Sequence, residues 1–238
     1  RFYRLFVPFL FLGTLLMLIA YFPSYYVGHG NIDIIAYIRD FFGTEKWPVG
    51  PPWFIWVLFV FNLLFALFYR VYIKLSDNIR LKLTVIKNKP VSFSLIMFCF
   101  TWILYVPIAY IIGAGTWTGI GPFDFQLSRI LLYFGYFTLG ILIGNTDFNN
   151  EVFSTKSVIV EKWWLWLLLS LVVYCTLTII PEPLKHMLKN NTINEFYAWM
   201  IYYIIYAASC TISCIAFITT FRRVISKENN LWNSLSEN

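Results

Sequence analysis

Six long apolar segments alternate with short polar loops along this chain of 238 residues. Each segment comes close to the roughly 20 residues that a helix needs to cross a bilayer core. The alternating pattern of a membrane β-barrel is absent, and a lipid-exposed backbone must otherwise satisfy its own hydrogen bonds within helices. The sequence therefore predicts an all-α integral membrane helical bundle with about six transmembrane helices. The predicted spans are Leu5–Phe22, Trp53–Tyr69, Phe93–Ile112, Leu127–Ile143, Trp163–Ile180 and Phe196–Thr220.

The composition agrees with a chain that lies in lipid. Hydrophobic residues make up 59% of the sequence, and within the predicted spans only Arg129, at the edge of the fourth, carries a charge. A helix on the core of a soluble protein shows a polar stripe at helical period, which these segments lack. A soluble globular protein is therefore excluded.

The basic residues are concentrated on one alternate set of loops. Thirteen of the eighteen Lys and Arg residues lie at the chain start, in 70–90, in 145–162 and after Phe221. The acidic residues divide evenly between the two sides, so they do not cause this bias. Because Lys- and Arg-rich loops stay in the cytoplasm during insertion, this side is predicted to be cytoplasmic. The net charge of +6 thus reflects topology and requires no nucleic-acid partner.

One segment outside the spans has an apolar helical face. Within Ile32–Phe42 this face comprises Ile34, Ile35, Ile38, Phe41 and Phe42, with Asp33, Arg39 and Asp40 away from it. The segment is too short to span a bilayer. It predicts either a helix lying flat at the outer membrane surface or a loop helix packed between spans.

Small residues predict close contacts between helices. Gly140 and Gly144 form a GxxxG motif on the fourth span, with Gly135 before it. The sixth span has a small face of Ala208, Ser209, Cys210, Ser213 and Cys214. All four cysteines lie inside spans without partners at metal-ligand spacing, so we predict packing roles for them and no metal site.

Residues that point to chemistry are few and lie at the two surfaces. Both histidines fall in outer loops, and the chain has no buried carboxylate pair and no nucleophile elbow, so no catalytic residue is assigned. Arg1 and Arg4 lie three residues apart at the start of the first span. Guanidinium groups bind phosphates bidentately. The pair is predicted to be either a clamp for a phosphorylated donor or a topology anchor.

Aromatic residues gather at the opposite surface. A Pro- and Gly-rich turn carries Trp47 and leads into Trp53 and Trp56 at the start of the second span. A second outer loop, Gly113–Gln126, adds Trp117 and Asp124. Aromatic residues at the outer membrane surface suit contact with a sugar ring. We therefore predict that these residues lie on the side of the protein that binds the acceptor. The alternative is an interfacial aromatic belt.

Four segments in this order resemble acyltransferase family 3, a family of multi-pass membrane acyltransferases. Arg1-Phe2-Tyr3-Arg4-Leu5 through Pro8 resembles its R-x-x-R-[LI]-x-x-P motif. Gly50-Pro51-Pro52-Trp53-Phe54 resembles its G-x-x-W-F segment, and Leu132–Phe137 with Gly140 and Gly144 resembles its Y-F-x-x-F-x-x-G helix. Leu235–Asn238 is similar to the lead-in to its S-Y-G-I-Y-L-x-H helix. The resemblance covers the whole chain.

The resemblance implies an O-acyl transfer in the bacterial inner membrane. Acyl-CoA would be a co-substrate presented from the cytoplasm, a hydroxyl of a cell-envelope glycan would accept the group, and no cofactor would stay bound. Arg1 and Arg4 match the basic motif of the family, so the resemblance assigns them to the donor phosphates.

The resemblance leaves the catalytic base outside this chain. The family carries its catalytic His in an R-x(10)-H motif on the first helix, and no segment here matches it. We therefore expect residues 1–238 to form a single transmembrane acyltransferase-like domain that is incomplete at both ends. The alternative function is a multi-pass transporter or flippase for a lipid-linked or sugar substrate. Transporters commonly contain broken helices, and Pro107 in the third span is the strongest candidate for such a break.

Overall fold

The computed structural model describes residues 2–30, 33–43, 50, 52–75, 89–144 and 152–224. It confirms a helical membrane bundle. Within this part of the chain, five helical stretches are long and apolar enough to cross a membrane, and a bent pair of helices supplies a sixth candidate. The five stretches are Phe2–His29, Pro90–Ile112, Leu127–Gly144, Trp163–Lys189 and Glu195–Val224. Each contains one predicted span, and most extend beyond it.

The second predicted span is bent. Helix α3 (Trp53–Leu67) and the short helix Tyr69–Leu75 meet at an angle of 80°. Phe68, between them, has φ −101° and ψ 19°, which lie outside the α region and end α3. The predicted span ends at Tyr69, two residues after α3 ends, so the bend lies at its boundary. Pro107, in contrast, lies inside α5 (Pro90–Ile112) without interrupting it, so the predicted candidate break is not there.

The helices group into two compact units. The first comprises Arg1–Tyr72 and Ile112–Phe134, and the second comprises Ile73–Ile111 and Gly135–Asn238. Helix α6 (Ile130–Gly144) begins in the first unit and continues in the second. That the whole chain is one domain stays a prediction.

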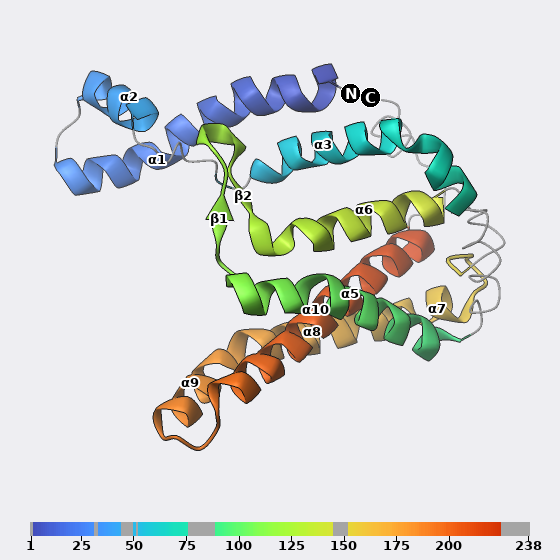
Figure 1. Cartoon of the computed structure of the whole chain (residues 1–238). Helices are drawn as coiled ribbons and strands as arrows, with labels where there is room; N and C mark the ends of the chain where they lie inside the picture. The colour runs from blue at the N-terminus through green and yellow to red at the C-terminus, as the bar shows by residue number, and fades with distance from the viewer. Residues whose placement is uncertain are drawn as a thin grey trace. The chain divides into compact units, whose positions relative to one another are not determined.

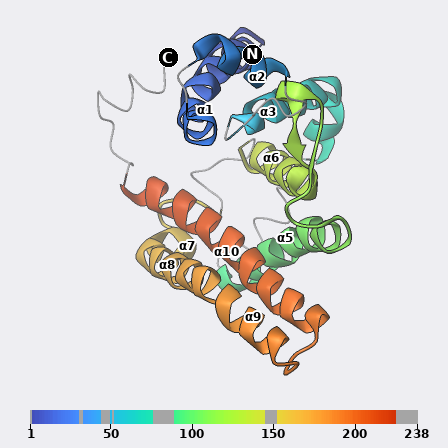
Figure 2. The same ribbon diagram turned by 90° about the vertical axis from the view of Figure 1, so that its left-hand side faces the viewer.

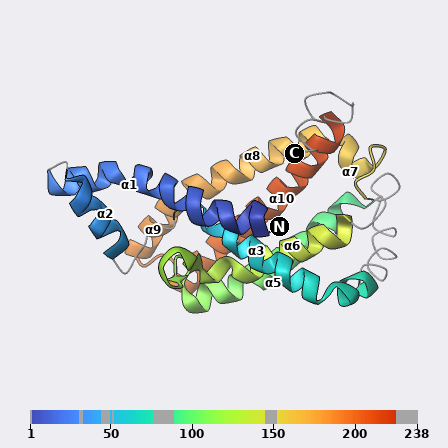
Figure 3. The same cartoon turned by 90° about the horizontal axis from the view of Figure 1, so that it is seen from above.

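The first unit begins with a long helix whose first part contains π-helical segments and whose second part is α-helical. Two π-helical segments, η1 (Phe2–Phe6) and η2 (Phe9–Gly13), precede α1 (Thr14–His29). Helix α2 (Ile34–Gly43) folds back beside α1 (Figures 1 and 3). The carboxylate of Asp33 caps α2 by accepting hydrogen bonds from the backbone N–H groups of Ile35 and Ala36, both at 3.0 Å.

Helix α2 packs on α1 through one face only. Tyr37 and Phe41 are buried against Met17, and the Tyr37 hydroxyl donates to the Leu18 carbonyl at 2.6 Å. The opposite side of the helix leaves large apolar side chains exposed, namely Ile34, Ile35, Ile38 and Phe42. The packing on α1 agrees with the prediction of a packed loop helix, and a place at the outer membrane surface stays a prediction. The helix packs against a span and also presents an apolar surface that suits the membrane interface.

A small hairpin, which the sequence did not predict, completes the first unit. Strand β1 (Trp117–Thr118) pairs antiparallel with β2 (Phe125–Gln126), with the 3₁₀ helix η3 (Gly121–Phe123) between them (Figure 1). A further 3₁₀ turn, η4 (Leu127–Arg129), leads into α6. Strands of two residues are too short to produce an alternating pattern, so hydropathy does not reveal them.

The second unit contains α5, most of α6, and four further helices. These are α7 (Val158–Glu161), α8 (Trp163–Ile179), α9 (Pro181–Lys189) and α10 (Glu195–Val224). Helices α8 and α10 run side by side, with α9 at the turn between them (Figures 2 and 3). Pro181 suits the first turn of α9, where no backbone N–H is required.

Side chains of α5 reach α6 at Gly135. A Cβ atom at this position would be 3.0 Å from the Phe100 ring and would clash with Leu104. At Gly140 and Gly144 a Cβ atom would have no described heavy atom within 4 Å of it. Within the described part of the chain, the GxxxG pair is therefore not the close contact that the sequence predicted. Among these three glycines, only Gly135 has side chains of another helix against it.

A buried loop lies at the Lys- and Arg-rich end of the second unit. Phe153, Ile159 and Val160 are almost fully buried and form a core with Trp166. The Trp166 indole donates to the Ile159 carbonyl at 3.1 Å, and the Nε of Arg222 donates to the Phe153 carbonyl at 3.1 Å. These contacts hold the loop against the end of α10, which we call the basic end of that helix.

Candidate functional site

Arg4 is exposed on the first turn of the N-terminal helix. The neighbouring Phe2 and Phe6 stack on each other at 5.2 Å and pack against Phe59 of α3, with ring centroids 5.9 and 5.3 Å apart. This aromatic anchor leaves the Arg4 side chain free to reach an anion. The π-helical turn around it is unusual, and such turns recur at functional sites. Arg1 lies outside the described residues, so its place beside Arg4 stays a prediction.

The structure brings three of the four predicted acceptor-side tryptophans together, a group that we call the tryptophan cluster. The rings of Trp53 and Trp117 meet edge-to-face at 5.6 Å. Trp56, one helical turn after Trp53, packs edge-to-face on Phe123 and Phe125 of the hairpin loop. Trp53 is 8% exposed, whereas Trp117 is 49% exposed. Trp47 lies outside the described residues.

Hydrogen bonds from side chains to backbone carbonyls hold the hairpin at the start of α3. The Trp56 indole donates to the Asp124 carbonyl at 3.3 Å. Below the strands, the Gln126 amide and the Ser128 hydroxyl both donate to the Ala114 carbonyl, at 3.0 and 2.8 Å. Trp117 is therefore an exposed ring on a rigid support, which is the arrangement that stacking on a sugar requires.

Asp124 contributes to the turn as well as to the surface. A Cβ atom at Gly119 would lie 2.5 Å from the Phe123 carbonyl and 2.7 Å from the carboxylate of Asp124. Gly119 has φ +143°, a conformation that favours glycine. The Asp124 carboxylate thus lies against the turn backbone beside the tryptophan cluster. The backbone carbonyl of Asp124 accepts a hydrogen bond from Trp56, and the role of Asp124 at an acceptor site stays a prediction.

A second group of polar residues, which sequence reasoning missed, lies inside the second unit. Thr101 of α5 lies 2.7 Å from the Tyr136 hydroxyl of α6 and 3.1 Å from the Thr211 hydroxyl of α10. Thr101 also donates to the Met97 carbonyl at 2.8 Å, so its single proton is used there. Tyr136 and Thr211 therefore both donate to Thr101. We call these three residues the hydroxyl cluster.

The hydroxyl cluster borders a cavity of about 120 Å³ between α5, α6, α10 and the buried loop. Most of its lining is apolar, and it comprises Phe93, Met97, Tyr136, Leu139, Gly140, Ile143, Phe153, Thr211, Cys214, Ile215 and Ile218. Cys214 interacts with Tyr136 at the same wall. Along α10, Cys214 lies eight residues before Arg222, which is ~12 Å of helix axis. The cavity thus extends from near the basic end toward the middle of the apolar layer.

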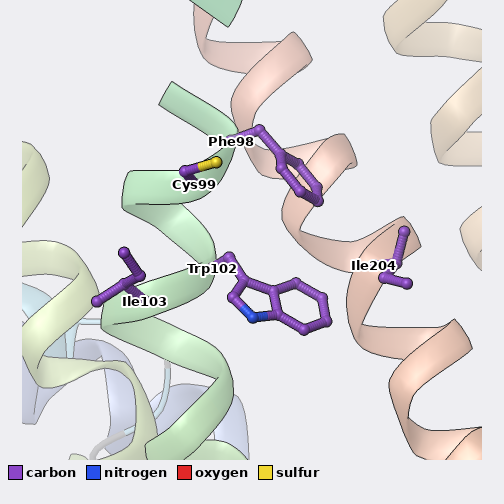
Figure 4. A pocket seen from close by; sticks show the side chains of 5 residues that line it. All are labelled: Phe98, Cys99, Trp102, Ile103 and Ile204. Atoms are coloured by element: carbon purple, nitrogen blue, oxygen red, sulfur yellow. The ribbon is translucent and has the colours of Figure 1, made fainter. Parts of the chain in front are cut away.

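An open apolar groove lies on another face of α5 and has a volume of about 490 Å³. Figure 4 shows Phe98 and Trp102 turned toward the helix that carries Ile204, with Ile103 turned away and Cys99 beside them. All the lining residues are apolar or sulfur-containing, so the groove offers no strong polar partner to a reacting group. It suits lipid contact. Cys99, Cys175 and Cys214 are exposed rather than packed as predicted.

The described residues supply binding surfaces but no acid–base pair. Among them, no group of three or more His, Cys, Asp or Glu residues is placed to hold a metal ion. The hydroxyl cluster is neutral, and a single hydroxyl in an apolar span is a weak signal in sequence. Nothing in the sequence joined Tyr136 to Thr101 and Thr211.

Comparison with known proteins gives one match. A family model described as an acyltransferase domain matches residues 1–238, which confirms the resemblance to acyltransferase family 3. No curated protein and no solved structure matches the chain.

Proposed function

The chain belongs to this acyltransferase family, and from that premise we propose that it is part of a bacterial inner-membrane O-acyltransferase. The enzyme would move an acyl group from cytoplasmic acyl-CoA to a hydroxyl of a cell-envelope glycan. The family match over the whole chain is the observation that carries acyl transfer. The apolar helices support a multi-pass membrane location.

Arg4 supports a donor site on the Lys- and Arg-rich side. Coenzyme A carries phosphates, which a guanidinium group binds through paired, charge-assisted hydrogen bonds. Arg4 is exposed at the start of its helix, and the rings of Phe2 and Phe6 fix that turn against α3. The bulky, charged nucleotide would stay at this surface, because burying its charges in lipid is costly. Only the acyl arm would enter the apolar layer.

The tryptophan cluster supports an acceptor site, and the charge bias of the loops predicts that this site lies on the outer side. A sugar presents C–H groups on its ring faces, and an exposed aromatic ring offers a matching flat apolar surface. Trp117 provides such a ring and is held by Trp53 behind it. The Asp124 carboxylate would accept hydrogen bonds from the sugar hydroxyls.

The first test measures the transfer of radiolabelled acetyl from acetyl-CoA to envelope glycan in membranes that contain the full natural protein. Arg4→Ala is expected to lower transfer at least tenfold and to raise the KM for acetyl-CoA. Arg70→Ala is the matched control, because Arg70 is also exposed on the Lys- and Arg-rich side but lies after the bend. Equal effects in the two variants would reduce Arg4 to a topology anchor.

The acceptor arm of the test uses Trp117→Ala. It should raise the KM for the glycan about tenfold while the KM for acetyl-CoA stays within twofold. Trp164→Ala is the control, because Trp164 is similarly exposed but lies at the start of α8. No acyl transfer by the unaltered protein with any short acyl-CoA would contradict the proposed function and favour the transporter or flippase.

A further inference from the structure

We propose that the cavity of about 120 Å³ beside the hydroxyl cluster is a slot for the acyl chain of the donor thioester and that its volume limits the chain length. This inference rests on the proposed function, because an acyltransferase must hold an acyl chain within the apolar layer. It adds a binding site and a specificity determinant, Gly140, which neither the sequence motifs nor the family match assigns.

The walls of the cavity suit an alkyl chain. Along the slot they consist of hydrocarbon and aromatic side chains, including Phe93, Leu139 and Phe153. At the inner wall, the donors of Tyr136 and Thr211 are both used by Thr101. An alkyl chain that ends against this wall therefore leaves no hydroxyl donor of the cluster without a partner. A charged or strongly polar ligand would find no compensating group here.

The volume of the cavity indicates how long a chain it holds. A dry apolar cavity of ~150 Å³ holds benzene, which gives roughly 25 Å³ for each carbon. By that measure, a cavity of about 120 Å³ accommodates a chain of about five carbons. The cavity also lies within ~12 Å of Arg222 along α10. A chain that enters from the basic end would place its methyl group at the hydroxyl cluster and its thioester nearer that end.

Gly140 offers a direct way to change this volume. It lines the cavity, and a Cβ atom there would have no described heavy atom within 4 Å, so a larger side chain would enter free space without backbone strain. Gly144 lies one helical turn later on α6 and has equally open surroundings, but it does not line the cavity. The same substitution at the two glycines therefore separates cavity filling from a general effect on the helix.

The test compares acetyl-CoA, butanoyl-CoA and pentanoyl-CoA as donors for the full natural protein in membranes. Gly140→Leu is expected to lower kcat/KM for the pentanoyl donor roughly tenfold or more relative to the acetyl donor. Gly144→Leu should show the same relative kcat/KM for the three donors as the unaltered protein. Gly140→Ala should produce a smaller shift in the same direction, which keeps the test decisive where the leucine variant fails to accumulate. If all three variants show the same ratios of kcat/KM among the donors, the proposed slot is wrong, but the proposed acyl transfer still stands.

A second readout does not depend on turnover. Cys214 lines the cavity and is exposed, whereas Cys99 lies on the open groove of Figure 4. In proteins that retain only one of these cysteines, pentanoyl-CoA should slow the reaction of Cys214 with N-ethylmaleimide at least fivefold and leave Cys99 unchanged. Acetyl-CoA should protect less.

The two readouts separate the possible failures. Unaltered Cys214 labelling at saturating pentanoyl-CoA would refute the slot. Equal protection by a free fatty acid or by added phospholipid would assign the cavity to lipid and would also overturn the proposal. An absence of transfer from every acyl-CoA would instead refute the proposed function, whatever the labelling shows.

Discussion

At the scale of single residues, the α5–α6 contact depends on the absence of a side chain at Gly135. A Cβ atom there would meet Phe100 and Leu104, whereas one at Gly144 would meet nothing described within 4 Å. Forcing extra volume into a packed interface typically costs about 1–3 kcal/mol. Gly135→Ala should therefore lower the thermal unfolding temperature in detergent by several degrees. Gly144→Ala should leave it unchanged or raise it, and the reverse order would show that α5 and α6 do not meet at Gly135.

The hydroxyl cluster makes a separate prediction at this scale. Thr101→Val keeps the shape of the side chain but leaves the Tyr136 and Thr211 hydroxyls without their shared acceptor. Hydrogen bonds between membrane helices average ~0.6 kcal/mol, and the loss of two of them should lower stability by about 1 kcal/mol. Thr176→Val is the control, because Thr176 bonds only to its own helix at an exposed position. Thermal unfolding of the two variants checks the difference, and Thr101→Ser should restore most of it.

At the scale of elements, helix α2 depends on one buried phenol. Burial raises the pKa of Tyr37 above its usual value of 10.0, and the negative charge of Asp40 raises it further. The Tyr37 phenol therefore ionises at a lower pH when α2 is undocked than when it is docked. The docking of α2 is unaffected below pH 10 and weakens as the pH rises through the raised pKa. The phenolate absorbance of the unaltered protein minus that of Tyr37→Phe should titrate above pH 10. A difference curve with its midpoint at or below 10 would contradict the burial of Tyr37.

The elements also show what hydropathy predicts and where it stops. All six spans were located within a few residues, because lipid selects apolar helices of a fixed length. The bend at Phe68 and the β1–β2 hairpin were missed, since both depend on local backbone geometry in short segments. The buried loop with Phe153 was also missed, because its burial comes from contacts distant in sequence.

The candidate site was likewise predicted only in part from the sequence. Trp53, Trp56 and Trp117 were placed on one side from loop parity alone, and the structure brings them together. Thr101, Tyr136 and Thr211 lie on three different spans, and their meeting depends on how each helix is rotated about its axis. In lipid, an apolar helix gives little sequence signal for that rotation, because all of its faces are hydrophobic.

At the scale of the whole molecule, the topology decides whether the donor and acceptor surfaces face the compartments that the reaction needs. Coenzyme A is cytoplasmic, so the turn that carries Arg4 and the basic end of α10 must face the cytoplasm for acyl transfer to work. The distribution of Lys and Arg residues predicts this orientation. Green fluorescent protein fused after Val224 should fluoresce, and alkaline phosphatase fused after Asn190, between α9 and α10, should be active. The opposite pattern would place Arg4 outside the cell, out of reach of acyl-CoA, and would require a different donor and a different function.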